Sequence, residues 1–125
     1  MTIDEYQIKA HSFAQHNSKM YPFLGLAEEA GEVCGKMAKF IRKHNGIAPR
    51  TSNEMEEFDP MHIANFDDDL QFAKDVSKEL GDCCWMIAEC ATVYGFSLSD
   101  IMGENIMKLA DRKARNVIVG EGDNR

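Results

Sequence analysis

The stretch GLAEEAGEVCGKMAKFIRKH, residues 25–44, carries apolar side chains at spacings of three and four: Leu26, Ala30, Val33, Met37, Phe40 and Ile41. This spacing is typical of an α-helix that buries one face. Pro22 comes just before the pattern, and Asn45-Gly46 follows it with residue types that often end helices. We therefore expect a helix from about residue 22 to 44.

A second long apolar pattern indicates a helix from about Asp69 to Tyr94, with these residues on its buried face: Phe72, Val76, Leu80, Cys83, Ile87, Cys90 and Tyr94. A shorter helix is expected over residues 3–16. A fourth would begin at Ser97 or Ser99, with an inner face of Met102, Asn105, Ile106 and Leu109. The pattern predicts an all-α, four-helix-bundle-like domain spanning residues 1–125.

Between the two long patterns, about residues 46–68 show little periodicity and are rich in acidic side chains, together with Pro49 and Pro60. We expect a long acidic loop here. A loop of this length inside a small domain is unusual and often functional.

The composition excludes several classes of protein. The chain has 125 residues, 44% hydrophobic residues and a net charge of −7. The acidic balance argues against a nucleic-acid polymer as partner, and neither a membrane span nor a signal peptide is expected. We expect a cytoplasmic protein. Cys34, Cys83, Cys84 and Cys90 show no C-x-x-C spacing and are interpreted as buried, reduced thiols rather than a zinc site.

Two carboxylate pairs lie on the two long helices: Glu29 and Glu32 on the first, Glu79 and Asp82 on the second. A spacing of three places both members of a pair on one helix face. The spacing alone decides little, because the acidic loop contains the same E-x-x-E pattern at Glu54.

Helical phase adds the missing information. At about 100° per residue, Glu29 and Glu32 fall about 60° and 120° to one side of Leu26. Glu79 and Asp82 fall at the same two angles from Val76. Both pairs therefore border the core on equivalent sides of their helices.

Carboxylates gathered in this way repel one another unless a cation joins them, and all-oxygen ligands suit Mg²⁺ or Mn²⁺. A divalent ion held in this way binds phosphate oxygens well. Asn105, Lys108 and Arg112 have the same phase on the fourth helix, and Lys36 follows Glu32 on its own helix, so these groups are candidates for phosphate or sugar contacts.

Alternatives remain at this point. The acids are equally readable as solvated partners of nearby lysines, in which case the chain is a non-catalytic oligomeric helical adaptor. A di-iron carboxylate bundle is disfavoured, because it needs Glu-x-x-His motifs and no Glu here has His three residues later.

The chain resembles the MazG-type all-α nucleoside triphosphate pyrophosphohydrolases, including their small phage and bacterial members. The stretches that carry the resemblance are Tyr6-Gln7, GLAEEAGEVCGK at 25–36, KELGD at 78–82, ENIMKLADRKAR at 104–115 and the terminal GDNR. Together they cover most of the chain outside the acidic loop, which is longer than expected for this family.

The resemblance implies an oligomeric MazG-type fold, a homodimer or homotetramer, with two or more Mg²⁺ or Mn²⁺ ions held by Glu29, Glu32, Glu79 and Asp82. It implies hydrolysis of a (d)NTP, with a purine dNTP such as dGTP or dATP as the expected substrate, to the monophosphate and pyrophosphate. Glu29 or Glu32 would activate the water. Asn105, Lys108 and Arg112, together with Lys36 and Arg125, would contact the nucleotide. A phage-encoded member would act in the host cytoplasm.

Overall fold

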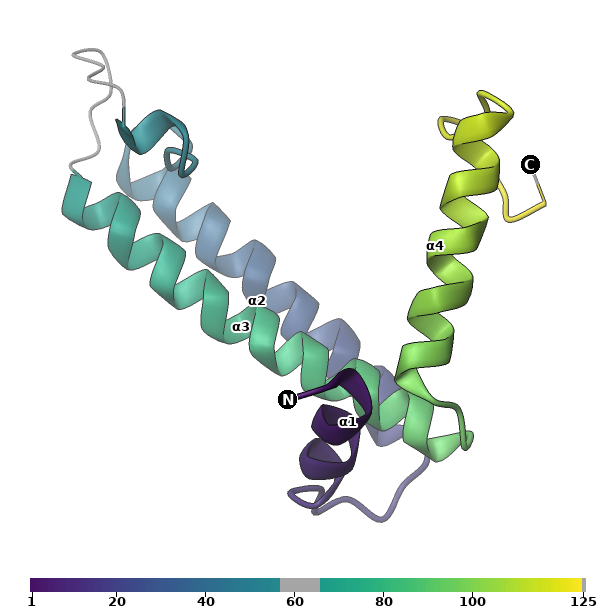
Figure 1. Ribbon diagram of the computed structural model, residues 1–125. Helices are drawn as coiled ribbons and strands as arrows, with labels where there is room; N and C mark the ends of the chain where they lie inside the picture. Colours follow the sequence, from purple (N-terminus) through teal and green to yellow (C-terminus); the bar gives the residue numbers. More distant parts are fainter. Residues whose placement is uncertain (57–65, 125) are drawn as a thin grey trace. The chain divides into compact units, whose positions relative to one another are not determined.

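The computed structural model describes residues 1–56 and 66–124, and within them the regular elements are helices (Figure 1). They are α1 (Ile3–His11), α2 (Tyr21–Lys43), the short 3₁₀ helix η1 (Glu54–Glu56), α3 (Phe66–Val93) and α4 (Leu98–Ala114). The all-α class predicted from the sequence is confirmed.

The chain forms two compact units, residues 16–87 and residues 1–15 with 88–125. The first unit is a hairpin in which α2 and the larger part of α3 run side by side (Figure 1). Its cross-helix contacts pair Phe40 with Phe72, Lys36 with Glu79, and Gly25 with Met86. In these pairs, lower residue numbers on α2 go with higher residue numbers on α3, so the two helices are antiparallel.

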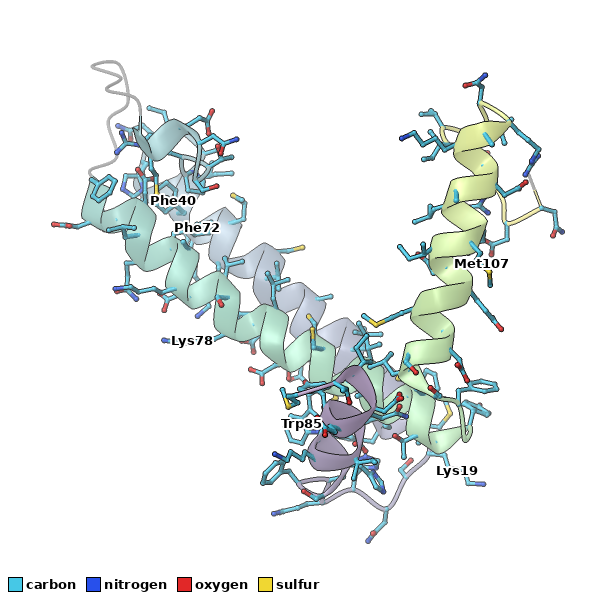
Figure 2. All side chains as sticks on the ribbon, in the orientation of Figure 1. Lys19, Phe40, Phe72, Lys78, Trp85 and Met107 are labelled. Carbon is cyan, nitrogen blue, oxygen red and sulfur yellow. The ribbon has the colours of Figure 1, made fainter. Side chains whose placement is uncertain are left out.

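The hairpin packs through a few close contacts. The rings of Phe40 and Phe72 lie 5.2 Å apart, edge to face (Figure 2). Met86 is 3% exposed, and a Cβ atom at Gly25 would stand 2.6 Å from its sulfur. A glycine at position 25 therefore lets α2 and α3 approach with Met86 between them, and Met86 fills the core.

The far end of the hairpin is closed by polar side chains. His44 follows α2, stacks on Phe40 at 4.0 Å and contacts Asp68 at 3.0 Å. Asn45 and Gly46 both have positive φ, and Gly46 N–H donates to the Ile41 carbonyl, which ends the helix as predicted. His44 is buried, and its ring fills the space between Phe40 and Asp68.

In the second unit, Gln7 of α1 holds the junction between α3 and α4. Its amide nitrogen donates to the Thr92 hydroxyl and the Phe96 carbonyl, and its amide oxygen accepts from Leu98 N–H. Ser97 caps α4 by accepting from Asp100 N–H, which confirms the first of the two predicted caps.

Several boundaries differ from the sequence-based expectation. α1 ends at His11 and not near residue 16, since the Ser12 hydroxyl donates to the Lys9 carbonyl and competes with a further helical turn. α3 begins at Phe66, with Asp67, Asp68 and Asp69 in its first turn. Of the predicted acidic loop, residues 57–65 lie outside the described residues.

Two expectations about burial were wrong. The predicted inner face of α4 is exposed, with Met102 48%, Ile106 66% and Leu109 38% accessible. The four cysteines are free, but Cys34 and Cys84 are exposed and Cys83 and Cys90 only half-buried. Both errors have one cause: the helical period marks an apolar face without telling whether this chain covers it.

Across residues 1–56 and 66–124, none of the helices combines the length and apolar character needed to cross a bilayer.

Candidate metal centre

Three of the four predicted carboxylates come together on the hairpin. Glu29 lies on α2, and Glu79 and Asp82 lie one turn apart on α3. One carboxylate oxygen from each of them lies within 4.8 Å of the others. The antiparallel register explains this, because it places residue 29 beside residues 82 and 83. We call Glu29, Glu79 and Asp82 the acidic triad.

Glu32, the fourth predicted ligand, is exposed one turn along α2 and is not part of the triad. Its charge still reaches the site, because it helps to raise the pKa of Glu29. The structure therefore places Glu32 at the edge of the cluster.

The electrostatics of the triad favour a bound cation. Desolvation raises the pKa of Glu29 above its usual range, and the charges of Asp82 and Glu32 raise it further. Clustered carboxylates repel and lose hydration together, so a positive charge between them is strongly stabilising. The same acids and burial raise the pKa of the neighbouring Cys83 thiol, which keeps it protonated.

Lys36 supplies a positive charge from within the hairpin. Its ammonium lies 3.0 Å from a carboxylate oxygen of Glu79, whose side chain is 12% exposed. Lys43, two turns further along α2, pairs instead with Asp68. Lys36 had been predicted to contact the nucleotide; in this structure its partner is Glu79.

The predicted cationic row lies on α4, in the other unit. Asn105 is exposed, and the Lys108 side chain is 42% exposed. Arg112 is 5% exposed and donates to the Asp123 carbonyl at 2.9 Å. The Asp123 carboxylate lies 3.4 Å from Arg112 and 3.6 Å from Lys108, and these two cations lower its pKa. Arg125, the last predicted contact, lies outside the described residues.

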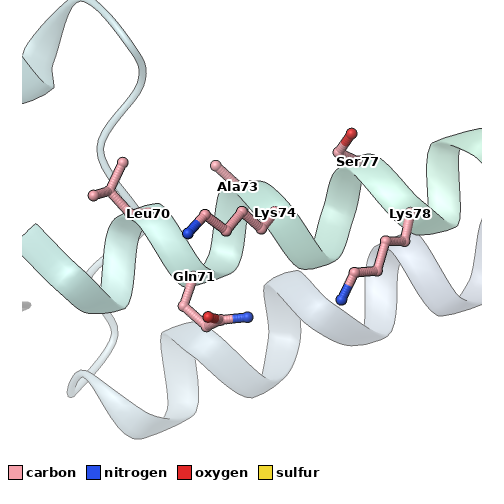
Figure 3. A pocket seen from close by; sticks show the side chains of 6 residues that line it. All are labelled: Leu70, Gln71, Ala73, Lys74, Ser77 and Lys78. Carbon is pink, nitrogen blue, oxygen red and sulfur yellow. The ribbon is translucent and has the colours of Figure 1, made fainter.

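Two open grooves lie away from these groups. One, of about 640 Å³, is lined by α3 side chains alone (Figure 3): Leu70, Gln71, Ala73, Lys74, Ser77 and Lys78. The other, of about 400 Å³, borders α1 and contains Gln7, His11 and Thr92. Neither of these two grooves is lined by a triad residue.

Sequence reasoning missed the paired buried acids. Glu89 on α3 is fully buried beside His11, 3.1 Å away, and Asp69 is fully buried beside Arg50, 2.7 Å away. An acidic residue inside the apolar run IAECA was the available signal for Glu89. This signal does not identify the partner of Glu89, which lies 78 positions away in the sequence.

An all-helical hairpin that presents oxygen ligands from neighbouring helices is typical of a helical metal-dependent hydrolase. Residues 15–117 match the family described as the MazG nucleotide pyrophosphohydrolase domain. The chain therefore belongs to the MazG nucleotide pyrophosphohydrolase family, as the resemblance indicated, and membership supports a nucleotide pyrophosphohydrolase activity in general terms.

The chain is also similar to a phage protein. The chain is 33% identical to the Gene 37 protein of Mycobacterium phage L5 over 134 aligned residues, covering 100% of each chain. No match was found among solved structures.

Proposed function

We propose that this protein hydrolyses a nucleoside triphosphate to the monophosphate and pyrophosphate, with water attacking the α-phosphorus. A new bond forms between the water oxygen and the α-phosphorus, the bridge to the β-phosphate breaks, and pyrophosphate leaves with those electrons. The observation that carries the proposal is the acidic triad, three carboxylates from two packed helices within 4.8 Å, in a chain of this family.

The residues fit a hard divalent cation. Every donor in the triad is an oxygen, the ligand type that Mg²⁺ and Mn²⁺ prefer. With Glu32 at the edge, four negative charges balance two divalent ions, which supports the proposal of two ions per site. A bound ion supplies positive charge that neutralises phosphate oxygens and activates water.

The protein groups divide into three roles. Glu29, Glu79 and Asp82 would hold the cations, and Glu32 lies one turn from Glu29 on the same helix. We assign orientation and deprotonation of the attacking water to Glu32, with Glu29 as the alternative carboxylate for this role. Asn105, Lys108 and Arg112 are proposed to contact the phosphates and sugar, and Arg125 the nucleotide.

We further propose that the active form is a homodimer or homotetramer. The face of α4 formed by Met102, Ile106 and Leu109 is apolar and exposed, and Met107 beside it is 66% exposed (Figure 2). Trp85 has a buried indole N–H that finds no acceptor among the described residues. A second copy of the chain would cover the apolar face of α4.

The proposed substrate is a purine deoxynucleoside triphosphate such as dGTP or dATP, and the proposed location is the cytoplasm of an infected host if the gene is carried by a phage. The competing proposal is a non-catalytic helical adaptor, for which the triad would be a solvated cluster without a ligand.

The test is incubation with all eight common NTPs and dNTPs, with Mg²⁺, Mn²⁺ or EDTA, and chromatographic identification of the products. The proposal predicts monophosphate and pyrophosphate from at least one nucleotide, with the metals but not with EDTA. Glu79→Gln should reduce kcat/KM by about a hundredfold or more. Glu54→Gln, which alters the equally spaced loop acid, should retain activity. Intact nucleotides throughout would support the adaptor instead.

A further inference from the structure

Lys36 is the cation that the structure places on a triad carboxylate. Its side chain leaves α2 one turn after Glu32, crosses to α3 and brings its ammonium to 3.0 Å from Glu79. The Lys36 side chain is 33% exposed and the Glu79 side chain 12% exposed. A charge-assisted hydrogen bond at this distance, partly shielded from water, is far stronger than a surface ion pair.

The surroundings reinforce this position. Glu79 raises the pKa of Lys36, chiefly through their hydrogen bond, and Asp75 and Glu32 add to the effect. The ammonium is therefore fully charged at neutral pH and sits in a negative field built by both helices. Lys36 does within the chain what a metal ion would do for the triad: it offsets the mutual repulsion of the acids.

The ammonium and a metal ion on Glu79 would conflict. A divalent ion such as Mg²⁺ would bind this carboxylate at about 2.0–2.1 Å from one of its oxygens. An ammonium on the same group would then be only a few ångströms from two further positive charges, where repulsion is strong because the surroundings are partly desolvated. The contact between Lys36 and Glu79 therefore competes with metal binding at Glu79.

We propose that Lys36 is the resident counter-cation of the acidic triad and that a divalent metal binds by displacing its ammonium from Glu79. This inference rests on the proposed metal site and deepens it. Lys36 lowers the apparent affinity for the metal and stabilises the hairpin when no metal is bound.

Metal affinity measured without nucleotide tests the displacement directly. Mn²⁺ binding is followed by electron paramagnetic resonance and calorimetry for the wild type, Lys36→Met and Lys39→Met. Lys39 provides a matched control, because it is an exposed lysine on the same helix one turn further on. Lys36→Met should lower the Mn²⁺ Kd by about tenfold relative to the wild type, whereas Lys39→Met should change it less than threefold.

Thermal unfolding gives a second readout. Without metal, Lys36→Met should have a lower Tm than the wild type, since its triad is left without a counter-cation. Saturating Mn²⁺ should remove that difference. Lys36→Arg, which keeps a cation beside Glu79, should bind Mn²⁺ no more tightly than the wild type, and it preserves the test if Lys36→Met does not fold.

The outcomes separate the two proposals. A wild type that binds Mn²⁺, together with a Lys36→Met Kd equal to or above that of Lys39→Met, would overturn the displacement and leave the metal site standing. The same holds if Lys36→Arg binds Mn²⁺ tenfold more tightly than the wild type. A wild type with no measurable Mn²⁺ binding, while Lys36→Met also binds none, would overturn the metal site itself.

Discussion

The acidic triad on the hairpin and the cationic row on α4 are built in different ways. The triad lies between two helices that this chain packs together, and Glu79 is 12% exposed with its counter-ion supplied by α2. On α4, every residue from Ile101 to Asp111 is exposed, and Arg112 is covered by the chain's own C-terminal segment. Within this chain the acidic triad is partly covered by its own hairpin, whereas α4 is exposed from Ile101 to Asp111.

The acidic triad and the cationic row each have a counter-ion from the same chain, but the two ion pairs differ in strength. Lys36 contacts a carboxylate that is nearly buried, whereas the Asp123 side chain is 88% exposed and lies at 3.4 and 3.6 Å from its partners. An exposed contact of this kind is easily exchanged for another anion. We expect the contacts of the cationic row to exchange readily with other anions, and the packing of the hairpin around the acidic triad to persist.

The largest expected effect concerns the exposed apolar face of α4. Ile106→Glu places a charge on the exposed apolar face of α4, where a second copy is proposed to bind. Light scattering should show a multiple of the 14.1 kDa chain for the wild type and 14.1 kDa for this variant. Lys113→Glu, a charge change at the end of the same helix, should leave the oligomer intact. A wild type of 14.1 kDa would refute the second copy.

The second effect concerns the C-terminal segment. Arg112→Ala removes the donor to the Asp123 carbonyl and should release residues 116–124 from α4, raising the rate of thermolysin cleavage at Ile118 or Val119 about tenfold. Lys108→Ala removes a longer, more exposed contact and should change that rate less than threefold. Equal cleavage rates in the two variants would mean that Arg112 does not hold the segment.

The third effect tests the close packing of the hairpin. Gly25→Ala forces the Met86 sulfur to move and should lower the free energy of unfolding by about 1 kcal/mol. Gly31→Ala meets nothing within 4 Å and should raise it by about 0.5–1 kcal/mol through helix propensity. Urea denaturation measures both. Equal changes in the two variants would contradict the packing described at Gly25.

The smallest effect is the pH dependence of the closed end of the hairpin. Hydrogen bonds from His44 and Lys43 lower the pKa of Asp68. A depressed carboxyl pKa contributes stability above the unfolded value of about 3.9, and this contribution disappears as the pH falls through the lower folded value. Asp68→Asn should therefore be less stable than the wild type at pH 7 and converge with it at acid pH. A gap that stays constant with pH would exclude this carboxylate as its source.

The sequence was informative wherever local chemistry decides the structure. Ser97 was predicted as one of two possible caps and Asn45-Gly46 as a helix end, because both follow from residue type and helical period. Helical phase placed Glu29, Glu79 and Asp82 at the border of the core on α2 and α3, and the antiparallel register brings these three together.

The rest depended on long-range contacts that no local pattern specifies. The partner of Lys36 is 43 positions away, and that of His11 is 78 positions away. Glu32 has the same kind of spacing as the triad acids, yet its side chain is exposed and is not part of the triad. Met102, Ile106 and Leu109 mark an apolar face correctly, but whether the same chain covers it is a tertiary property.

The central claim, water attack at the α-phosphorus supported by the acidic triad, is tested most directly by hydrolysis in ¹⁸O-labelled water with Mn²⁺ and mass spectrometry of both products. The account predicts one ¹⁸O atom in the nucleoside monophosphate and none in the pyrophosphate, with both products lost in Glu79→Gln. Label in the pyrophosphate, or release of a nucleoside diphosphate and inorganic phosphate, would contradict it.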